Sequence, residues 1–145
     1  METKEQLSNI RWVKSAYYRL DADIIFDPSD FQKGGEFYND EEGWIPIGDS
    51  DIPFSGSFDG NNHIIKNIVV NEAEAENAGI FGVSSGNIKN MGVVNAKISG
   101  KKYVGAVTGQ NKGCIEKCST TGTIIAEQYT GGISGGNSGS IMNCY

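Results

Sequence analysis

Tyr103 and Tyr129 are the residues of this sequence best placed to bind a ligand. They recur at the period of a repeat described below, and Lys102 and Gln128 directly precede them. Where a chain coils with that period, equivalent residues stack, and stacked aromatic rings offer an apolar surface that can hold a sugar ring. The same rings are equally able to cover a loop, so the pair fits either role.

Asp49, Asp51 and Asp59 are the candidates for a calcium site, because hard cations bind several oxygen atoms of one loop. Neither acidic fragment, at residues 49–51 or 59–61, continues into an EF-hand loop, which needs a glutamate at position twelve. Such short patterns arise often by chance. We therefore expect these carboxylates to cap solvated turns, with no metal or cofactor bound.

Catalysis would require carboxylates paired along a groove, as in glycoside hydrolases. Acidic residues crowd the first half of the chain, whereas Glu116 and Glu127 are the only ones between residues 91 and 145. His63, the only histidine, has no sequence partners that define a Ser/His/Asp arrangement. We expect no catalytic residue, and a structural hydrogen bond for His63.

The three cysteines, Cys114, Cys118 and Cys144, are too few and too widely spaced for a zinc site. Cys118 and Cys144 occupy equivalent positions one repeat apart. In stacked coils their Cα atoms would lie about 4.8 Å apart, which permits a disulfide. Two stacked thiols that pack as small apolar groups fit the same spacing.

These candidates lie in or beside a chain that repeats itself. A pattern that ends in glycine recurs at positions 78–82, 105–109 and 131–135, and a Gly-x-Ile pattern follows each copy. The units contain short β-prone runs and no amphipathic stretch long enough for a helix. Self-similarity at a fixed period of this kind indicates stacked units.

Stacked coils of short strands predict that equivalent side chains form ladders. Three ladders are expected: Ile80–Val107–Ile133, Ile88–Ile115–Ile141 and Met91–Cys118–Cys144. The recurring glycines are expected at corners with positive φ, which glycine adopts without steric cost.

The Gly-Gly-Ile-Ser-Gly-Gly-Asn sequence at 131–137 and the end of the chain at 141–145 resemble the GLUG motif of bacterial surface proteins. Residues 44–48 and 54–68 resemble the segment that precedes GLUG repeats. The resemblance implies a right-handed parallel β-helix in a secreted or surface-anchored, adhesin-like protein, with no catalytic residue to carry over. Asn62 stands where the family has glycine, and asparagine tolerates the left-handed conformation.

The part before the repeats is expected to cap the solenoid. Thr3 and Gln6 match a capping box, and apolar residues at helical spacing, Trp12 among them, continue to about Ser15. One short helix over the open end of the first coil would explain this pattern. We expect irregular first coils over 1–76 and regular repeats over 77–145, in one continuous domain.

Three further segments have predictable character. Alternating apolar residues predict a single strand over 18–26, and the charged residues at 71–77 predict a loop. Residues 64–70 repeat the Ile-Lys-Asn-apolar pattern of residues 88–91, so regular coiling is expected to begin there.

Bulk properties narrow the function. The net charge of −6 and the pI near 4.7 argue against binding to nucleic acid or to an anionic membrane. No apolar run approaches the roughly 18 residues of a membrane span, and the polar start does not resemble a signal peptide. For a surface protein this start predicts an excised segment; a cytoplasmic protein is the alternative, which the GLUG resemblance disfavours. Because the third repeat is incomplete at Tyr145, we expect the N-terminal piece of a longer array.

The expected function is that of a non-catalytic, extracellular or cell-surface module of a bacterial protein. Its stacked coils would display loops to host or matrix glycans or proteins, or space a distal domain. The alternatives are a β-helix that binds or cleaves polysaccharide, and an accessory segment of a larger secreted hydrolase or protease. The exposed last coil also predicts end-to-end association, because unpaired strand edges template pairing.

Overall fold

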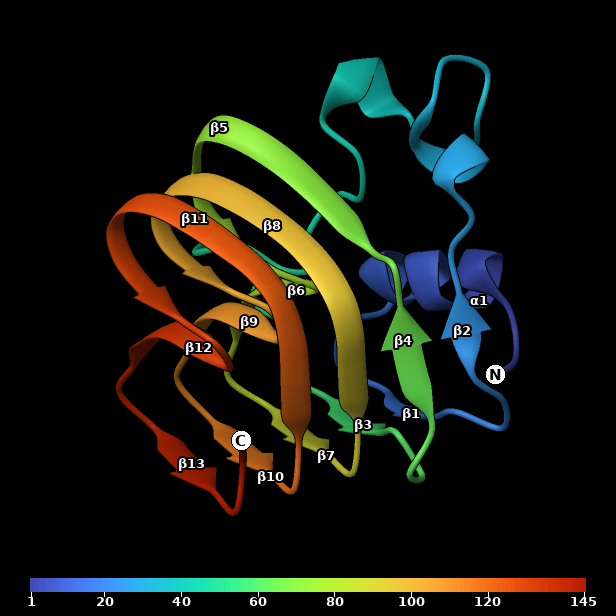
Figure 1. The fold of residues 1–145 in the computed structure, drawn as a ribbon. Coiled ribbons are helices and arrows are strands. Elements are labelled where there is room, and N and C mark those ends of the chain that lie inside the picture. The colour runs from blue at the N-terminus through green and yellow to red at the C-terminus, as the bar shows by residue number, and fades with distance from the viewer.

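Short parallel strands coil around one apolar interior in the computed structural model, which describes residues 1–145. Figure 1 shows the strands stacked coil upon coil, with the helix α1 at the end where the chain begins. The architecture is a parallel β-solenoid with one short N-terminal α-helix, which confirms the predicted fold class.

Three sheets run along the solenoid. The first sheet contains β1 (Tyr17–Arg19), β3 (Ser57–Asp59), β7 (Asn87–Lys89), β10 (Cys114–Glu116) and β13 (Ser140–Met142). The second contains β2 (Ile24–Ile25), β4 (Ile64–Lys66), β5 (Val69–Ala78), β8 (Gly92–Gly105) and β11 (Ser119–Gly131). The third contains β6 (Phe81–Ser84), β9 (Thr108–Asn111) and β12 (Ser134–Asn137).

The register confirms the predicted ladders. Ile115 pairs with Ile88 on one side and with Ile141 on the other. Beside the third sheet, the amide of Phe81 donates to the carbonyl of Val107, and the amide of Val107 donates to that of Ile133. Equivalent residues therefore lie directly above one another, which gives the sequence its period.

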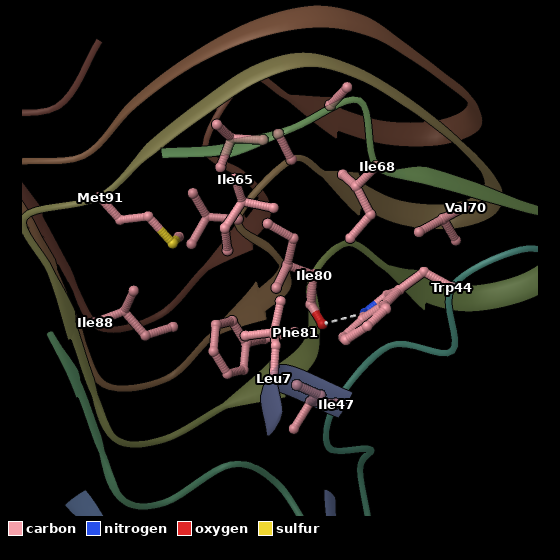
Figure 2. Packing of buried hydrophobic residues seen from close by; sticks show 14 of the residues in the cluster. Leu7, Trp44, Ile47, Ile65, Ile68, Val70, Ile80, Phe81, Ile88 and Met91 are labelled. Carbon is pink, nitrogen blue, oxygen red and sulfur yellow. Dashed lines mark hydrogen bonds between the residues drawn. The ribbon is translucent and has the colours of Figure 1, made fainter. Parts of the chain in front are cut away.

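The core is one cluster of 26 buried residues that extends from Leu7 to Cys118. Figure 2 shows its packing around Ile80 and Trp44, whose indole Nε1 donates to the carbonyl of Ile80 at 3.1 Å. Trp44 also packs edge-on against Phe26, at 5.8 Å between ring centroids. Aromatic rings thus concentrate in the N-terminal part of the core, whereas the core residues after Phe81 include no aromatic ring.

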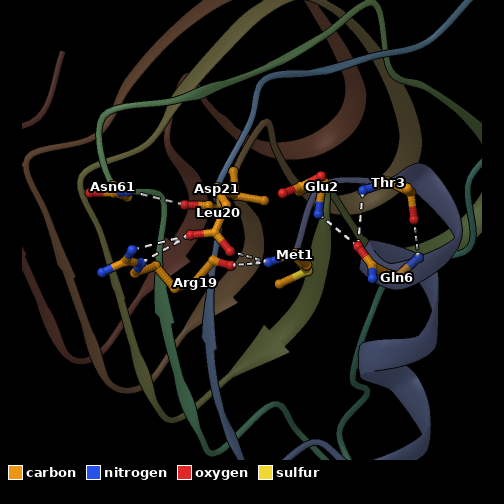
Figure 3. Close-up of polar contacts among 8 residues, drawn as sticks. All are labelled: Met1, Glu2, Thr3, Gln6, Arg19, Leu20, Asp21 and Asn61. Atoms are coloured by element: carbon orange, nitrogen blue, oxygen red, sulfur yellow. Dashed lines mark hydrogen bonds and ion pairs between the residues drawn. The ribbon is translucent and has the colours of Figure 1, made fainter.

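The N-terminal helix covers the first coil, as predicted. The helix α1 (Lys4–Asn9) continues into a 3-10 turn, η1 (Ile10–Trp12), and Leu7 and Ile10 are fully buried. Figure 3 shows the capping box, in which Thr3 and Gln6 exchange hydrogen bonds, and the contact from the side-chain amide of Asn61 to the carbonyl of Leu20. The helix ends several residues before the expected Ser15.

Two further 3-10 turns lie in the excursion between the first two coils. They are η2 (Pro28–Phe31) and η3 (Asn39–Glu41). Asp27 caps the first of them through a capping box with Asp30. This excursion carries Phe31 and Phe37 onto Phe26, so it extends the aromatic cluster of the first coil.

Several local predictions are wrong. The single strand expected over 18–26 is two strands, β1 and β2, because the chain turns a corner after Leu20. The loop expected at 71–77 belongs to β5, which pairs with β8 through a register shift between Glu72 and Glu76. Paired strands satisfy the backbone here despite the glutamates, of which Glu72 is half-buried and the other two are exposed. The expected boundary at residue 76 therefore falls inside β5.

The predicted alignment of 64–70 with 88–91 is also wrong. Ile65 pairs with Val93 in the second sheet, whereas Ile88 pairs with Phe58 in the first sheet. In both strands an asparagine with positive φ, Asn67 or Asn90, comes two residues after the buried isoleucine, because both strands end at corners of the same kind. The similarity in sequence therefore reflects corner chemistry and not equivalent positions.

The repeat glycines do not occupy positive-φ corners as expected. Asparagines fill most of those positions, including Asn62 at φ 63°, as the resemblance implied. The glycines instead allow close approach of backbones: a Cβ atom at Gly86 would collide with the carbonyl oxygen of Gly56, and one at Gly113 with that of Gly86. Gly139 stands in the same relation to Gly113.

Candidate functional site

One corner column joins residues that could face a ligand. The register of β5, β8 and β11 places Asn77, Tyr103 and Tyr129 at equivalent positions of three successive coils. Their φ angles are 64°, 54° and 57°. Asparagine adopts this left-handed region readily, whereas a bulky residue there is strained. The predicted stacking of the two tyrosines is therefore present, in an unusual backbone conformation.

Glycines across the corner make this conformation possible. A Cβ atom at Gly109 would lie 2.7 Å from the carbonyl oxygen of Tyr103, and one at Gly135 would lie 2.7 Å from that of Tyr129. The chain therefore folds back against itself at each corner. This close contact explains why the patterns at 105–109 and 131–135 end in glycine.

The two tyrosine rings stack face to face. Their centroids lie 4.9 Å apart with an interplanar angle of 11°. The ammonium of Lys102 lies 5.0 Å from the Tyr103 centroid and 5.7 Å from the Tyr129 centroid, within the range of cation–π attraction. Neither phenol hydroxyl makes a hydrogen bond within the chain, and Tyr129 is 57% exposed. This tyrosine edge, formed by Tyr103, Tyr129 and Lys102, offers hydrogen-bond donors beside aromatic carbon.

A hollow of about 360 Å³ adjoins this column at Asn77. Trp12, Ile45 and Glu76 also line it. Trp12, one of the apolar residues noted at helical spacing in the sequence, is 77% exposed. It projects outward because it lies two residues after the buried Ile10, a spacing that turns its side chain away from the core in an α-helix and in a 3-10 turn alike.

A second hollow, of about 500 Å³, is acidic. Its lining includes the carboxylates of Glu41, Glu42, Glu72 and Glu74. Burial raises the pKa of Glu72, and the nearby negative charge of Glu42 raises it further. The sequence predicted a loop at 71–77, so the strand pairing of β5 that brings Glu72 and Glu74 beside Glu41 and Glu42 was not foreseen.

The three calcium candidates act as turn residues and do not form a common site. Asp49 accepts hydrogen bonds from the amides of Asp51 and Ile52. Asp59 accepts from the amide of Asn61 and from the side chain of Asn90. Burial alone would raise the pKa of Asp59, but these hydrogen bonds and the charge of Lys89 lower it overall. No group of three or more metal-ligating side chains is present.

His63 makes a hydrogen bond between coils. Its Nδ1 lies 3.0 Å from the carboxylate of Asp23, which also accepts from the amide of Ile64 at 3.0 Å. These two contacts, that from Ile64 first, lower the pKa of Asp23. The pair joins the corner after β1 to the start of β4, which is the structural role expected for His63.

Cys118 and Cys144 stack as free thiols. The amide of Cys118 contacts the sulfur of Cys144 at 3.4 Å. Cys118 is buried, and burial raises the pKa of its thiol to about 12. A thiol with so high a pKa is a poor nucleophile at neutral pH, so it packs here as a small apolar group.

Two curated proteins resemble most of this chain. Halomucin of Haloquadratum walsbyi is 34% identical over 125 residues, which span 83% of this chain and 1% of that protein. A protein of Evansella cellulosilytica, proposed to be a Gly-rich membrane protein, is 31% identical over 130 residues, or 82% of this chain and 14% of its own length. The chain therefore spans only a small part of these relatives.

One solved structure shares the whole fold. It is a Bacteroides ovatus protein proposed to be an immunoglobulin A1 protease, with a TM-score of 0.70 and 27% sequence identity. The match covers all of this chain and 45% of that one. No protein-family model matches the chain, so its resemblance to GLUG proteins stays a prediction.

No helix of this chain has the length and apolar character that a membrane crossing requires.

Proposed function

We propose that this chain is a non-catalytic binding and spacing module of a surface protein, and that its tyrosine edge contacts glycans. The carrying observation is the stack of Tyr103 on Tyr129, at an exposed corner where the previous coil has Asn77. Hydroxyl-rich ligands can accept from the two phenols and from Lys102, while the ring edges contact their carbon atoms.

The backbone conformation supports a role in binding. A tyrosine held at positive φ costs on the order of 1–2 kcal/mol relative to a residue at ease there. The stacking of the rings recovers about 0.5–1.5 kcal/mol of this cost. Because stability alone would be served as well by asparagine, we attribute the tyrosines to recognition.

The relatives support a surface setting. One relative is named halomucin and the other is proposed to be a Gly-rich membrane protein, and both names suit a place at the cell surface. Both proteins contain a segment like this chain. The GLUG resemblance suggests the same setting, with bacterial adhesion as the finer proposal. The Bacteroides ovatus structure instead favours an accessory segment of a larger hydrolase, and a binding module serves that arrangement equally.

The test is binding of the purified chain to arrays of glycans and extracellular-matrix proteins, with Tyr103→Ala/Tyr129→Ala as the comparison. We expect a specific glycan signal that the double variant loses. A signal retained by the double variant would place binding elsewhere, and a blank array would reduce the module to a spacer.

The acidic hollow supports a second candidate, cleavage of a polysaccharide. A carboxyl group with a raised pKa beside an ionised one is the arrangement that glycoside hydrolases use as acid and base. Glu72 would act as the acid and Glu42 as the base. Release of reducing sugar from polysaccharides, lost in Glu72→Gln and kept in Glu74→Gln, would establish this activity. No release from any polysaccharide tested would exclude it.

A further inference from the structure

The hollow beside Trp12 has the composition of a sugar subsite. Trp12 presents most of its indole to solvent, whereas the other tryptophan, Trp44, is fully buried. Around the ring lie polar groups from separate segments, among them Asp49, Glu76 and Asn77. An exposed aromatic face ringed by hydrogen-bonding groups suits the apolar face and the hydroxyls of a pyranose.

The two cations that line this hollow, Arg11 and Lys14, both donate hydrogen bonds within the chain. The guanidinium of Arg11 donates to the carbonyls of Ser8 and Ile45 and lies over the Trp44 ring at 5.3 Å. The ammonium of Lys14 donates to the carbonyl of Arg11. Both cations therefore serve the fold, and desolvation lowers the pKa of Arg11.

Two carboxylates of the same hollow are free to bind. Glu72 and Glu76 line it, and neither accepts a hydrogen bond or forms an ion pair within the chain. Carboxylates accept hydrogen bonds from hydroxyl and ammonium groups and repel other carboxylates. The lining holds three carboxylates, of Asp49, Glu72 and Glu76, and two cations, of Arg11 and Lys14, so the excess of negative charge favours a neutral or positively charged occupant over a uronic acid.

Asn77 connects this hollow to the tyrosine edge. It lines the hollow and stands one coil before Tyr103 in the same column. Its side-chain oxygen accepts from Gln110 at 2.6 Å, which holds the amide in place. Two coil spacings, about 9.6 Å, separate Asn77 from Tyr129 along the axis. A single oligosaccharide lying along the axis can therefore reach both regions.

We propose that Trp12 stacks on a neutral or amino-sugar ring of a linear glycan that continues along Asn77 to the tyrosine edge. This proposal deepens the proposed function and rests on it for the second contact region. The indole supplies the face for the sugar, since the tyrosine rings cover one another. Glu72 and Glu76 accept from its hydroxyl or ammonium groups.

Calorimetry and tryptophan fluorescence on the intact chain test the proposal. The probes are hexamers of N-acetylglucosamine, which is neutral, of glucosamine, which is cationic, and of galacturonate, which is anionic. We expect saturable heat and a change in Trp12 emission with the neutral or the cationic hexamer, and neither with the anionic one. Trp12→Ala should weaken affinity about tenfold or more.

Matched variants separate stacking from other effects. Trp12→Phe keeps an aromatic face and should stay within a few-fold of wild type. Tyr17→Ala removes an aromatic side chain that is 62% exposed on a different sheet and should not change affinity. Because Trp12 lies outside the core, Trp12→Ala should keep the wild-type unfolding midpoint.

The outcomes distinguish this inference from the proposed function. Binding that survives Trp12→Ala but not Tyr103→Ala/Tyr129→Ala overturns the inference and leaves the tyrosine edge. Binding that survives the tyrosine double variant but not Trp12→Ala upholds the indole subsite and overturns the tyrosine edge. No saturable signal with either the neutral or the cationic hexamer, or equal binding of the anionic one, also overturns the inference.

Discussion

The regular coils and the first coil of this solenoid are built by different means. Between regular coils, paired residues such as Ile88 and Ile115 are separated by a single repeat of the sequence. Between the first coil and the second, Tyr18 pairs with Phe58 across a longer stretch, because the chain between them makes excursions outside the coil. Periodic columns of side chains stabilise the regular coils. An aromatic cluster and a helical cap stabilise the first coil.

The difference shows where recognition can be placed at little structural cost. A column position repeats in every coil, so the tyrosine edge replaces a corner asparagine and leaves the neighbouring strands unchanged. The irregular region is free of the repeat and can hold a single exposed residue such as Trp12. Asn77 lies next to both regions, because it lines the hollow beside Trp12 and stands one coil before Tyr103.

The largest effect is expected from the aromatic cluster. Trp44→Ala removes a fully buried ring that packs on Phe26 and donates to Ile80, and it should destabilise the chain by about 3–5 kcal/mol. Because the core is a single cluster, the regular coils should unfold in the same transition. Urea unfolding followed by circular dichroism measures both. A second transition that keeps the wild-type midpoint would show that the two regions fold independently.

The glycine column tests the regular coils. Gly113→Ala would drive a Cβ atom into the backbone of Gly86, and we expect a loss of about 3 kcal/mol. Gly132→Ala is the matched control, because its nearest neighbour is the Thr120 hydroxyl at 3.3 Å, and its midpoint should hardly change. Equal urea midpoints for the two variants would refute the close-approach explanation.

Acid should act first on the irregular region. The folded-state pKa of Asp23 is lowered by the amide of Ile64 and by His63, so its contribution is complete above the unfolded pKa of about 3.9 and is lost as pH falls below it. We expect the urea midpoint to drop as the pH falls through this range, and Asp23→Asn to reduce that drop. Asp51→Asn, whose carboxylate makes no hydrogen bond within the chain, is the control. A drop of wild-type size in Asp23→Asn would contradict this assignment.

The sequence predicted the regular coils well and the first coil poorly, for a physical reason. Stacking makes equivalent residues alike, so the recurrence of Ile88 as Ile115 discloses the fold. The first coil has no copy to compare with, so its corner after Leu20 was hidden inside an alternating pattern. The stack of Tyr103 on Tyr129 followed from the period, but their positive φ did not.

The hollows were beyond prediction because they join segments that sequence spacing does not relate. The acidic hollow depends on the pairing of β5, whose glutamates suggested a loop. The subsite beside Trp12 depends on a 3-10 turn and on a loop around Ile45. The tryptophan itself was visible in the sequence, and its spacing from Leu7 and Ile10 sets it off their buried face, but the segments that surround it could not be predicted.

The most direct test of the account replaces both tyrosines with the residue that the preceding coil already uses. Tyr103→Asn/Tyr129→Asn should keep the free energy of unfolding within about 1 kcal/mol of wild type, because asparagine adopts the corner conformation readily. The account predicts that this variant loses the glycan signal while its fold is unchanged. Undiminished glycan binding by the folded variant would contradict the claim that the tyrosine edge is the binding surface.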